Sequence, residues 1–295
     1  MDRTGKMFFD PAEIAHNYIE SGRKKLTYPL YKTLVLSILA GAFIAFAAQG
    51  SNVAVHTISS AGIAKALAGA LFTTGLMMVV ITGAELFTGN TLIVVSCMAK
   101  KTRRLTMFKN WLIVYFGNFI GSLIIVLLIV YSGQLDLSGG LLGGFTLKVA
   151  AHKTGLTFSQ AFFLGILCNW LVCLAVWMAS AAKDIAGKLL AIFFPIWLFV
   201  TSGFEHSVAN MYYIPAGILA KLNPDWVSQA IALGVTPEKI EQLTWGAFIV
   251  YNAIPVTLGN IIGGSVFVGM MYWLGFIYNS KQVPATEVED QRMAG

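Results

Sequence analysis

The chain has 295 residues, of which 57% are hydrophobic and 12% are charged, and its formal net charge is +6. A soluble domain usually carries about 25% charged residues. The deficit excludes a water-soluble globular domain and indicates a surface that mostly meets lipid.

The first 29 residues are polar and precede every long apolar segment. They are too polar for a cleaved signal peptide. Within them, residues 8–23 have the pattern of an amphipathic helix that starts near Asp10 and Pro11. We therefore predict a cytoplasmic amino-terminal region at 1–29 that carries an amphipathic helix.

Six apolar segments follow, each with about the 20 residues or more that a helix needs to cross a bilayer. They are residues 30–49, 64–99, 107–131, 157–181, 187–220 and 244–278. Backbone groups in lipid must be satisfied within a segment, so all six are predicted to be helices. The predicted fold is an all-α integral membrane channel domain at 30–280, followed by a short cytoplasmic tail at 281–295.

Lysine and arginine residues gather on one side of this predicted arrangement. Fifteen of the 20 are Arg3, Lys6, Arg23, Lys24, Lys25, Lys32, Lys100, Lys101, Arg103, Arg104, Lys109, Lys183, Lys188, Lys281 and Arg292. The other five, in the opposite loops, are Lys65, Lys148, Lys153, Lys221 and Lys239. Cytoplasmic loops are enriched in Lys and Arg. Both termini are therefore predicted to be cytoplasmic in a multi-pass cell (plasma or inner) membrane protein, and the net charge reflects topology rather than a nucleic-acid surface.

Two segments 120 positions apart share a pattern of glycine, glutamate and asparagine: Gly-Ala-Glu-Leu-Phe-Thr-Gly-Asn at 83–90 and Gly-Phe-Glu-His-Ser-Val-Ala-Asn at 203–210. A second pair, Gly-Asn-Phe-Ile-Gly at 117–121 and Gly-Asn-Ile-Ile-Gly at 259–263, follows each of them. Because each repeat has three spans, an odd number, the two repeats must have opposite orientations in the membrane. We predict two inverted three-helix repeats at about 30–132 and 157–278, with broken second and fifth helices that point to a substrate pathway. The glycines of 117–121 and 259–263 are predicted to allow close helix packing.

Each of the two long segments contains a carboxylate, which is costly within a membrane. We expect Glu85 and Glu205 to accept hydrogen bonds from backbone N–H groups freed where the helices break, with Asn90 and Asn210 as further structural residues there. Direct contact between the glutamates and a substrate is the alternative.

His206 is the one histidine of four that falls inside a predicted span. A lone intramembrane histidine often makes only an interhelical hydrogen bond. Its position directly after Glu205, at the predicted break, favours a role in the pathway, because imidazole can donate to an anion or hand it a proton. No metal or cofactor is expected, since Cys97, Cys168 and Cys173 lack metal-ligand spacing.

Four stretches of the chain resemble the signatures of the formate/nitrite transporter family. They are Glu-Leu-Phe-Thr at 85–88, Cys-Asn-Trp-Leu-Val-Cys-Leu-Ala at 168–175, the stretch at 203–210, and Ile-Pro-Val-Thr at 254–257 followed by Gly-Asn at 259–260. The resemblance extends from about residue 11 to residue 278. It implies an aquaporin-like protomer with its own pore in a homopentamer that conducts small monovalent anions such as formate, nitrite or hydrosulfide.

The resemblance also implies roles for particular residues. A cytoplasmic constriction would contain Leu76 and Phe199, and an outer constriction would contain Phe72, Leu86 and Phe87. Between them, the central residues would be His206, Thr88 and Asn169. Lys153, just before the fourth span, would attract anions to the outer mouth. Asn169 could equally be a purely interhelical hydrogen-bonding residue.

Two other functions are weighed against an anion channel. A neutral-solute pore of the aquaporin type suits the predicted repeats, but its Asn-Pro-Ala signature is absent, since the one Asn-Pro is at 223–224 in a loop. A membrane enzyme is disfavoured because the sequence shows no metal cluster and no Ser-His-Asp set. The expected partners are a small monovalent anion, membrane lipid and further copies of the chain, with no nucleic acid.

Overall fold

The computed structural model describes residue 6 and residues 8–278, so the predicted tail at 281–295 lies outside the described residues. Regular structure in this part of the chain is helical, apart from one isolated bridge between Phe8 and Ala182. The helices are α1 (Pro11–Leu26), α2 (Leu30–Val55), α3 (Ala61–Thr82), α4 (Phe87–Asn90), α5 (Val94–Met98), α6 (Arg104–Tyr131), α7 (Leu141–Thr154), α8 (Phe158–Ala181), α9 (Ile185–Thr201), α10 (Ser207–Ala220), α11 (Pro224–Ala232), α12 (Pro237–Gln242), α13 (Trp245–Ala247), α14 (Ile254–Gly264) and α15 (Met271–Phe276).

Five helical stretches of the described chain are long and apolar enough to cross a membrane. They are Leu30–Val55, Ala61–Thr82, Arg104–Tyr131, Phe158–Ala181 and Trp245–Phe276. The last includes two π-helical turns, Phe248–Ala253 and Ser265–Met270. Two shorter apolar stretches, Phe87–Met98 and Ile185–Thr201, complete the apolar set. All seven fall within the six segments predicted from hydropathy or overlap them closely.

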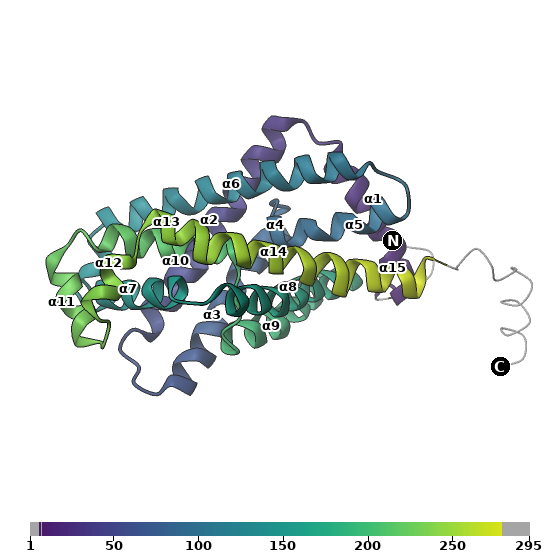
Figure 1. The fold of residues 1–295 in the computed structure, drawn as a ribbon. Coiled ribbons are helices and arrows are strands. Elements are labelled where there is room, and N and C mark those ends of the chain that lie inside the picture. Colours follow the sequence, from purple (N-terminus) through teal and green to yellow (C-terminus); the bar gives the residue numbers. More distant parts are fainter. Residues whose placement is uncertain (1–5, 7, 279–295) are drawn as a thin grey trace, which may run out of the picture.

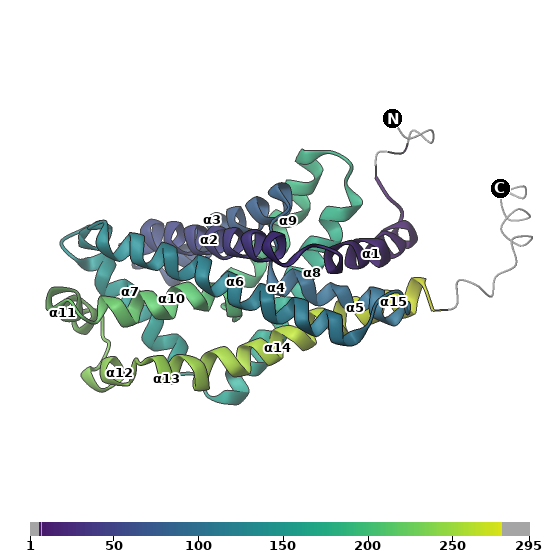
Figure 2. The same ribbon diagram turned by 90° about the horizontal axis from the view of Figure 1, so that it is seen from above.

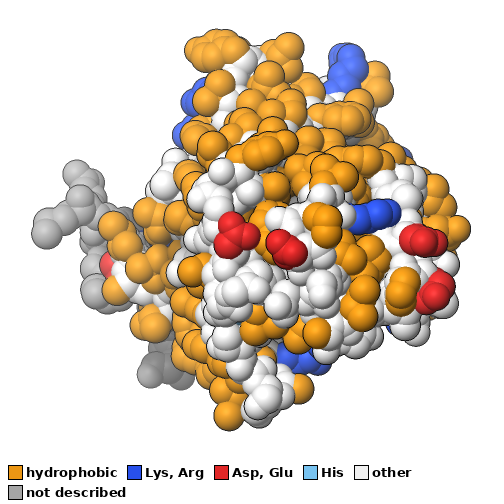
Figure 3. Space-filling view, turned by 90° about the vertical axis from the view of Figure 1, so that its left-hand side faces the viewer, with side chains coloured by type: hydrophobic (Ala, Val, Ile, Leu, Met, Phe, Trp, Pro, Cys, Tyr) orange, Lys and Arg blue, Asp and Glu red, His pale blue; other side chains and the backbone are white. Residues whose placement is uncertain are grey.

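The bundle has two distinct ends. Helices α1, α5 and α15 lie at one end, and α7, α11 and α12 lie at the other (Figures 1 and 2). The turn between α8 and α9 belongs to the first end, because Phe9 N–H donates to the carbonyl oxygen of Ala181 at 2.9 Å. The segments rich in lysine and arginine therefore share the end that carries α1. At the opposite end, Figure 3 shows hydrophobic and uncharged polar surface with scattered charges of both signs.

Glycines bring two pairs of helices into close contact. A Cβ atom on Gly121 would collide with the backbone of Ile38, which joins α6 to α2. A Cβ atom on Gly259 would collide with the backbone of Phe162, which joins α14 to α8. The predicted role of these glycines in close helix packing is confirmed.

Helices α7, α11 and α12 lie outside the six predicted segments and were not predicted. His152 and Lys153, which the sequence placed in an outer loop, lie on α7, and this helix packs mainly against α10 and α11. Residues 141–154 include two adjacent glycines and have no clear amphipathic period, so the local pattern favours a loop. Tertiary packing stabilises the helix instead: Leu142, Leu147 and Ala150 are fully buried.

Candidate functional site

The helical path is interrupted at two places deep in the bundle. Helix α3 ends at Thr82 and α4 begins at Phe87, while α9 ends at Thr201 and α10 begins at Ser207. Gly83 and Gly203 follow the first helix of each pair with φ values of 75° and 74°. This left-handed conformation is favourable for glycine and terminates a helix. Each gap thus leaves backbone N–H and C=O groups that need partners within the protein.

At each gap an asparagine side chain satisfies one backbone N–H and one C=O group. The Asn118 side chain accepts from Phe87 N–H at 2.9 Å and donates to the carbonyl oxygens of Ser37 and Glu85 at 2.7 and 2.9 Å. Both ends of the amide are therefore used, and the residue is fully buried. An amide suits this position because it offers a donor and an acceptor at once.

Asn260 makes the matching set of bonds at the second gap. Its side chain accepts from Ser207 N–H at 2.9 Å and donates to the carbonyl oxygens of Gly165 and Glu205 at 2.8 and 3.0 Å. Sequence reasoning assigned the segments around both asparagines to glycine packing alone. The signal that could have found them is the asparagine that follows the first glycine in each repeated segment, because an amide in lipid needs partners of its own.

The carboxylates of the two glutamates have partners other than those predicted. Glu85 pairs with Lys25 of α1 at 3.0 Å and accepts from the Asn90 amide at 2.7 Å. Glu205 pairs with Lys153 of α7 at 2.8 Å and accepts from the Asn210 amide at 2.6 Å. The expectation that these carboxylates accept backbone N–H groups at the breaks was wrong.

The physical reason is charge. A carboxylate that is 4–5% exposed needs a counter-charge to offset its lost hydration. A neutral amide can satisfy the backbone without that cost. A further asparagine extends each cluster, since Asn90 donates to Asn110 at 3.0 Å and Asn210 donates to Asn252 at 2.7 Å.

Replacing Lys153 with glutamine is expected to destabilise the folded protein by about 3–5 kcal/mol, because it leaves Glu205 buried without its counter-charge. The double variant Lys153→Gln/Glu205→Gln should recover most of this loss, since neither charge then remains. Thermal unfolding in detergent of the two single variants and the double variant measures the difference. Equal unfolding temperatures for Lys153→Gln and the native protein would contradict the role of the pair.

His206 lies at the start of α10 with both ring nitrogens in hydrogen-bond contact. Its Nδ1 accepts from Ala209 N–H at 3.1 Å, and its Nε2 lies 2.9 Å from the hydroxyl oxygen of Thr88. In a neutral ring the acceptor role of Nδ1 places the proton on Nε2, which then donates to Thr88. Both residues are buried. The structure therefore brings together two of the three predicted central residues across the two gaps.

Asn169, the third predicted central residue, lies behind Thr88. Its amide donates to the carbonyl oxygens of Asn260 and Thr88, at 2.6 and 3.3 Å, and to the hydroxyl of Thr91 at 3.2 Å. With its N–H groups used in this way, Asn169 connects α8 to the residues after the first gap and to α14. This arrangement matches the interhelical alternative considered for this residue.

The apolar residues predicted for two constrictions are grouped differently in the structure. Phe72 and Phe199 pack edge to face with ring centroids 5.7 Å apart, and Phe199 lies 6.1 Å from the His206 ring. Leu76 and Leu86 instead line a cavity on the side of α1. The sequence had paired Leu76 with Phe199 and Phe72 with Leu86. A motif position does not give a residue's depth along a pathway, and the antiparallel contact of α3 with α9 sets that depth.

Phe87, also predicted for a constriction, faces a different way. Its ring packs edge to face against Tyr115 and Trp111 of α6, with centroids 5.0 and 6.4 Å apart. It is buried. The structure therefore separates Phe87 from the Phe72–Phe199 pair.

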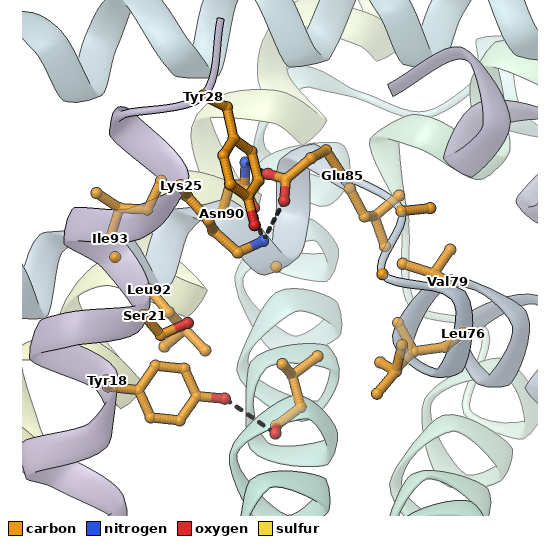
Figure 4. A pocket seen from close by; sticks show the side chains of 17 residues that line it. Tyr18, Ser21, Lys25, Tyr28, Leu76, Val79, Glu85, Asn90, Leu92 and Ile93 are labelled. Carbon is orange, nitrogen blue, oxygen red and sulfur yellow. Dashed lines mark hydrogen bonds and ion pairs between the residues drawn. The ribbon is translucent and has the colours of Figure 1, made fainter. Parts of the chain in front are cut away.

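The cavity on the side of α1 has a volume of about 270 Å³. Figure 4 shows that it lies between α1, which contributes Tyr18 and Lys25, and the residues around the first gap, which contribute Leu76 and Glu85. The Lys25 ammonium group reaches across to Glu85 and to the Asn90 side-chain oxygen, the latter at 2.7 Å. Helix α1 thus forms one wall of a cavity that Leu86 also lines.

Among the described residues, no three His, Cys, Asp or Glu side chains are grouped so that they could hold a metal ion. The titratable groups near the gaps are paired with lysine, asparagine or threonine. The arrangement can place the His206 ring, which can exchange a proton, beside the hydroxyl group of Thr88, between the apolar pairs Leu76–Leu86 and Phe72–Phe199. It can also neutralise each buried glutamate with a lysine.

The chain is similar to several known proteins. Residues 12–274 match the family model described as formate/nitrite transporter. The chain is 43% identical to the formate channel FocA of Escherichia coli strain K12, over 90% of this chain and 94% of the relative. It is 38% identical to a probable formate transporter of Methanothermobacter thermautotrophicus, over 92% and 99%. A solved structure described as a pentameric formate channel with formate bound matches with a TM-score of 0.75 and 40% identity, over 84% of this chain and 98% of that one.

Proposed function

Because the chain belongs to the formate/nitrite transporter family, we propose that this multi-pass membrane protein conducts small monovalent weak-acid anions, such as formate or nitrite, and that a proton accompanies them at His206. The family and the matched relatives are transporters and channels rather than enzymes. The observation that carries the proposal is the buried contact between His206 and Thr88 across the two gaps.

The proposed pathway runs from the cavity beside α1 to the outer end of the bundle. Leu76 and Leu86 form the cytoplasmic constriction, and Phe72 and Phe199 form the outer one. A bare anion loses most of its hydration in such an apolar passage, which is costly. Exchange of a proton with His206 between the two levels would make the solute neutral where the passage is driest. Phe87 supports this region from the side of α6.

At the outer mouth we propose that Lys153 contributes to anion attraction together with Lys65. The charge of Lys153 is balanced by Glu205, whereas Lys65 is exposed, and its ammonium group lies 3.8 Å from the place a Cβ on Gly203 would occupy. The three groups together leave one net positive charge beside the second gap. Such a charge raises the local concentration of anions.

We further propose that the spans form two inverted repeats, with broken second and fifth helices, in an aquaporin-like protomer whose termini are cytoplasmic. The matched bonds of Asn118 and Asn260 support this reading, as does the gathering of lysine and arginine at the α1 end. In this arrangement 1–29 is an amino-terminal region, and 30–280 is the channel domain. The likeness to a pentameric formate channel supports a homopentamer, which a mass measurement in mild detergent would check, since stable monomers or dimers would contradict it.

Stopped-flow measurements on liposomes test the proposed function. Native protein is expected to accelerate uptake of formate, nitrite, hydrosulfide or acetate, with the fastest rate identifying the preferred anion. Glycerol uptake, measured in the same vesicles, should match that of protein-free vesicles. Rapid glycerol uptake without anion uptake would support the neutral-solute pore instead.

Replacing Phe199 or Leu76 with alanine is expected to widen one constriction each and to admit larger monocarboxylates, because an apolar ring excludes solutes by size and by dewetting. The ratio of lactate to formate flux should rise about tenfold or more, which corresponds to a fall of about 1.4 kcal/mol in the barrier for lactate relative to that for formate. Phe194→Ala, which shortens an exposed side chain on α9, is the matched control. An unchanged ratio in both pore variants would remove these residues from the lining.

A further inference from the structure

A deep apolar groove runs along the outside of the bundle. It has a volume of about 870 Å³ and lies between α6 and the chain from Trp245 to Ile261. Its α6 wall includes Phe108, Leu112 and Phe116, each more than half exposed. Figure 2 shows that α6 and α14 lie on the same side of the bundle. Such a large apolar surface on a membrane helix needs an apolar occupant.

The groove is longer than one leaflet of a bilayer is thick. Its α6 wall extends from Phe108 to Leu123, which is about 22 Å at 1.5 Å per residue. The hydrocarbon core is about 30 Å thick, so one leaflet accounts for about 15 Å. A chain that enters the groove at the Phe108 end therefore passes the middle of the membrane before the groove ends.

Unpaired positive charges lie at the Phe108 end of this groove. They are Lys100, Lys101, Arg103, Arg104 and Lys109, all exposed. None of them takes part in an ion pair in the described part of the chain. Arg104 precedes Phe108 by four residues and Trp111 by seven, so it heads the same helical stripe that lines the groove. Lys109 lies beside that stripe, three residues before Leu112.

We propose that this groove is a binding site for an anionic phospholipid of the leaflet on the α1 side, with its phosphate at Arg104 and Lys109 and one acyl chain along α6. The positive charge at the Phe108 end of the groove favours an anionic lipid over other occupants. A second copy of the chain in parallel orientation would bring its own basic end to the same place, and a zwitterionic lipid would leave the cluster without a net counter-charge. Each lysine or arginine near an anionic lipid surface contributes about a factor of five in affinity.

The floor of the groove connects the lipid to the candidate pathway. Phe87, the first residue after the first gap, and Met211 of α10 both line the groove and are almost fully buried. Tyr115 lies between Phe87 and the groove opening, with its ring 5.0 Å from that of Phe87. The acyl chain would pack against Phe87, which directly follows Leu86. The lipid composition of the membrane would therefore affect the position of Phe87.

Fluorescence quenching by brominated acyl chains tests the proposal, because Trp111 and Trp245 line the groove. The protein is placed in vesicles in which brominated phosphatidylglycerol or brominated phosphatidylcholine replaces part of the lipid. Native protein is expected to be quenched at a lower mole fraction of the anionic lipid. In the Arg104→Gln/Lys109→Gln variant this preference should fall about twenty-five-fold, the product of two factors of five. The Trp245→Phe variant identifies the part of the signal that comes from the groove.

Lys188→Gln is the matched control, because it removes a positive charge at the start of α9, which does not line the groove. Its lipid preference should stay close to the native value. An unchanged preference in the double variant would overturn the site, as would an equal loss in Lys188→Gln, which would indicate a diffuse charge effect. Efficient disulfide cross-linking between copies through Leu112→Cys would also overturn it, since a second copy would then occupy the groove.

Discussion

Replacing His206 with asparagine is expected to leave a folded channel whose flux no longer depends on pH near neutrality. Asparagine is a preferred residue before the first turn of a helix, so it can keep the bond that His206 Nδ1 accepts from Ala209 N–H. Its amide can also donate to Thr88. The variant thus retains the polar contacts and loses only the titration of the ring.

The expected effect follows from the chemistry of the two side chains. An imidazole can gain and lose a proton between about pH 8 and pH 5, whereas an amide cannot. If the protonated ring hands its proton to the anion, native flux rises as pH falls through this range, and the variant shows a flat profile. Flux in liposomes and electrical recording on the same preparations, from about pH 5 to 8, measure both the solute and the charge it carries.

His152 provides a control outside the spans. Burial lowers the pKa of His152, and the nearby Lys153 lowers it further. This histidine therefore loses its proton at lower pH than usual, and His152→Asn should keep the native flux profile above neutrality. A native pH profile in an intact His206→Asn channel would refute the proton-transfer role, because a purely structural histidine predicts that result.

Replacing Asn260 with leucine is expected to prevent stable folding or assembly. The substitution leaves Ser207 N–H and the carbonyl group of Glu205 without their partner, whereas the carbonyl group of Gly165 lies inside α8 and keeps its intrahelical bond. A buried polar group left unsatisfied costs about 1–3 kcal/mol, so the two together cost about 2–6 kcal/mol. Size-exclusion profiles and unfolding temperatures in detergent measure this loss.

The same reasoning applies to the first gap, which gives the experiment an internal replicate. Asn118→Leu removes the corresponding bonds to Phe87 N–H and to the carbonyl oxygens of Ser37 and Glu85. Leu258→Ala, which shortens a half-exposed apolar side chain on α14, should have a much smaller effect. A monodisperse, native-like Asn260→Leu protein would show that other groups can satisfy the gap.

The sequence predicted the helical class and the positions of the two helix interruptions well, because both depend on strong local signals. Long apolar runs indicate membrane helices whatever their neighbours are. A glycine, a carboxylate and an asparagine at fixed spacing within such a run are costly unless they have a special role. The residues at 83–90 and 203–210 do surround the two gaps that the structure shows.

The partners across the bundle could not be predicted in the same way. Glu85 pairs with Lys25, which lies 60 residues earlier in a polar helix, and nothing in the local sequence connects the two. Phe72 meets Phe199 because α3 and α9 pack against each other over their lengths. Such contacts depend on the depth of each residue along the axis of the bundle. The periodicity of a single sequence carries no information about that depth.

The two ion pairs have a consequence for the electric field at the two ends of the proposed pathway. Lys25 lies five residues before the start of α2, and Lys153 lies five residues before the start of α8, so in each case a helix outside the long spans brings the cation to the carboxylate. The electric field at each end of the proposed pathway therefore depends on whether α1 or α7 is packed in place. With α1 in place, an approaching anion meets a neutral dipole at Glu85. Displacement of α1 would expose a full negative charge at the same spot, and this charge would repel an approaching anion.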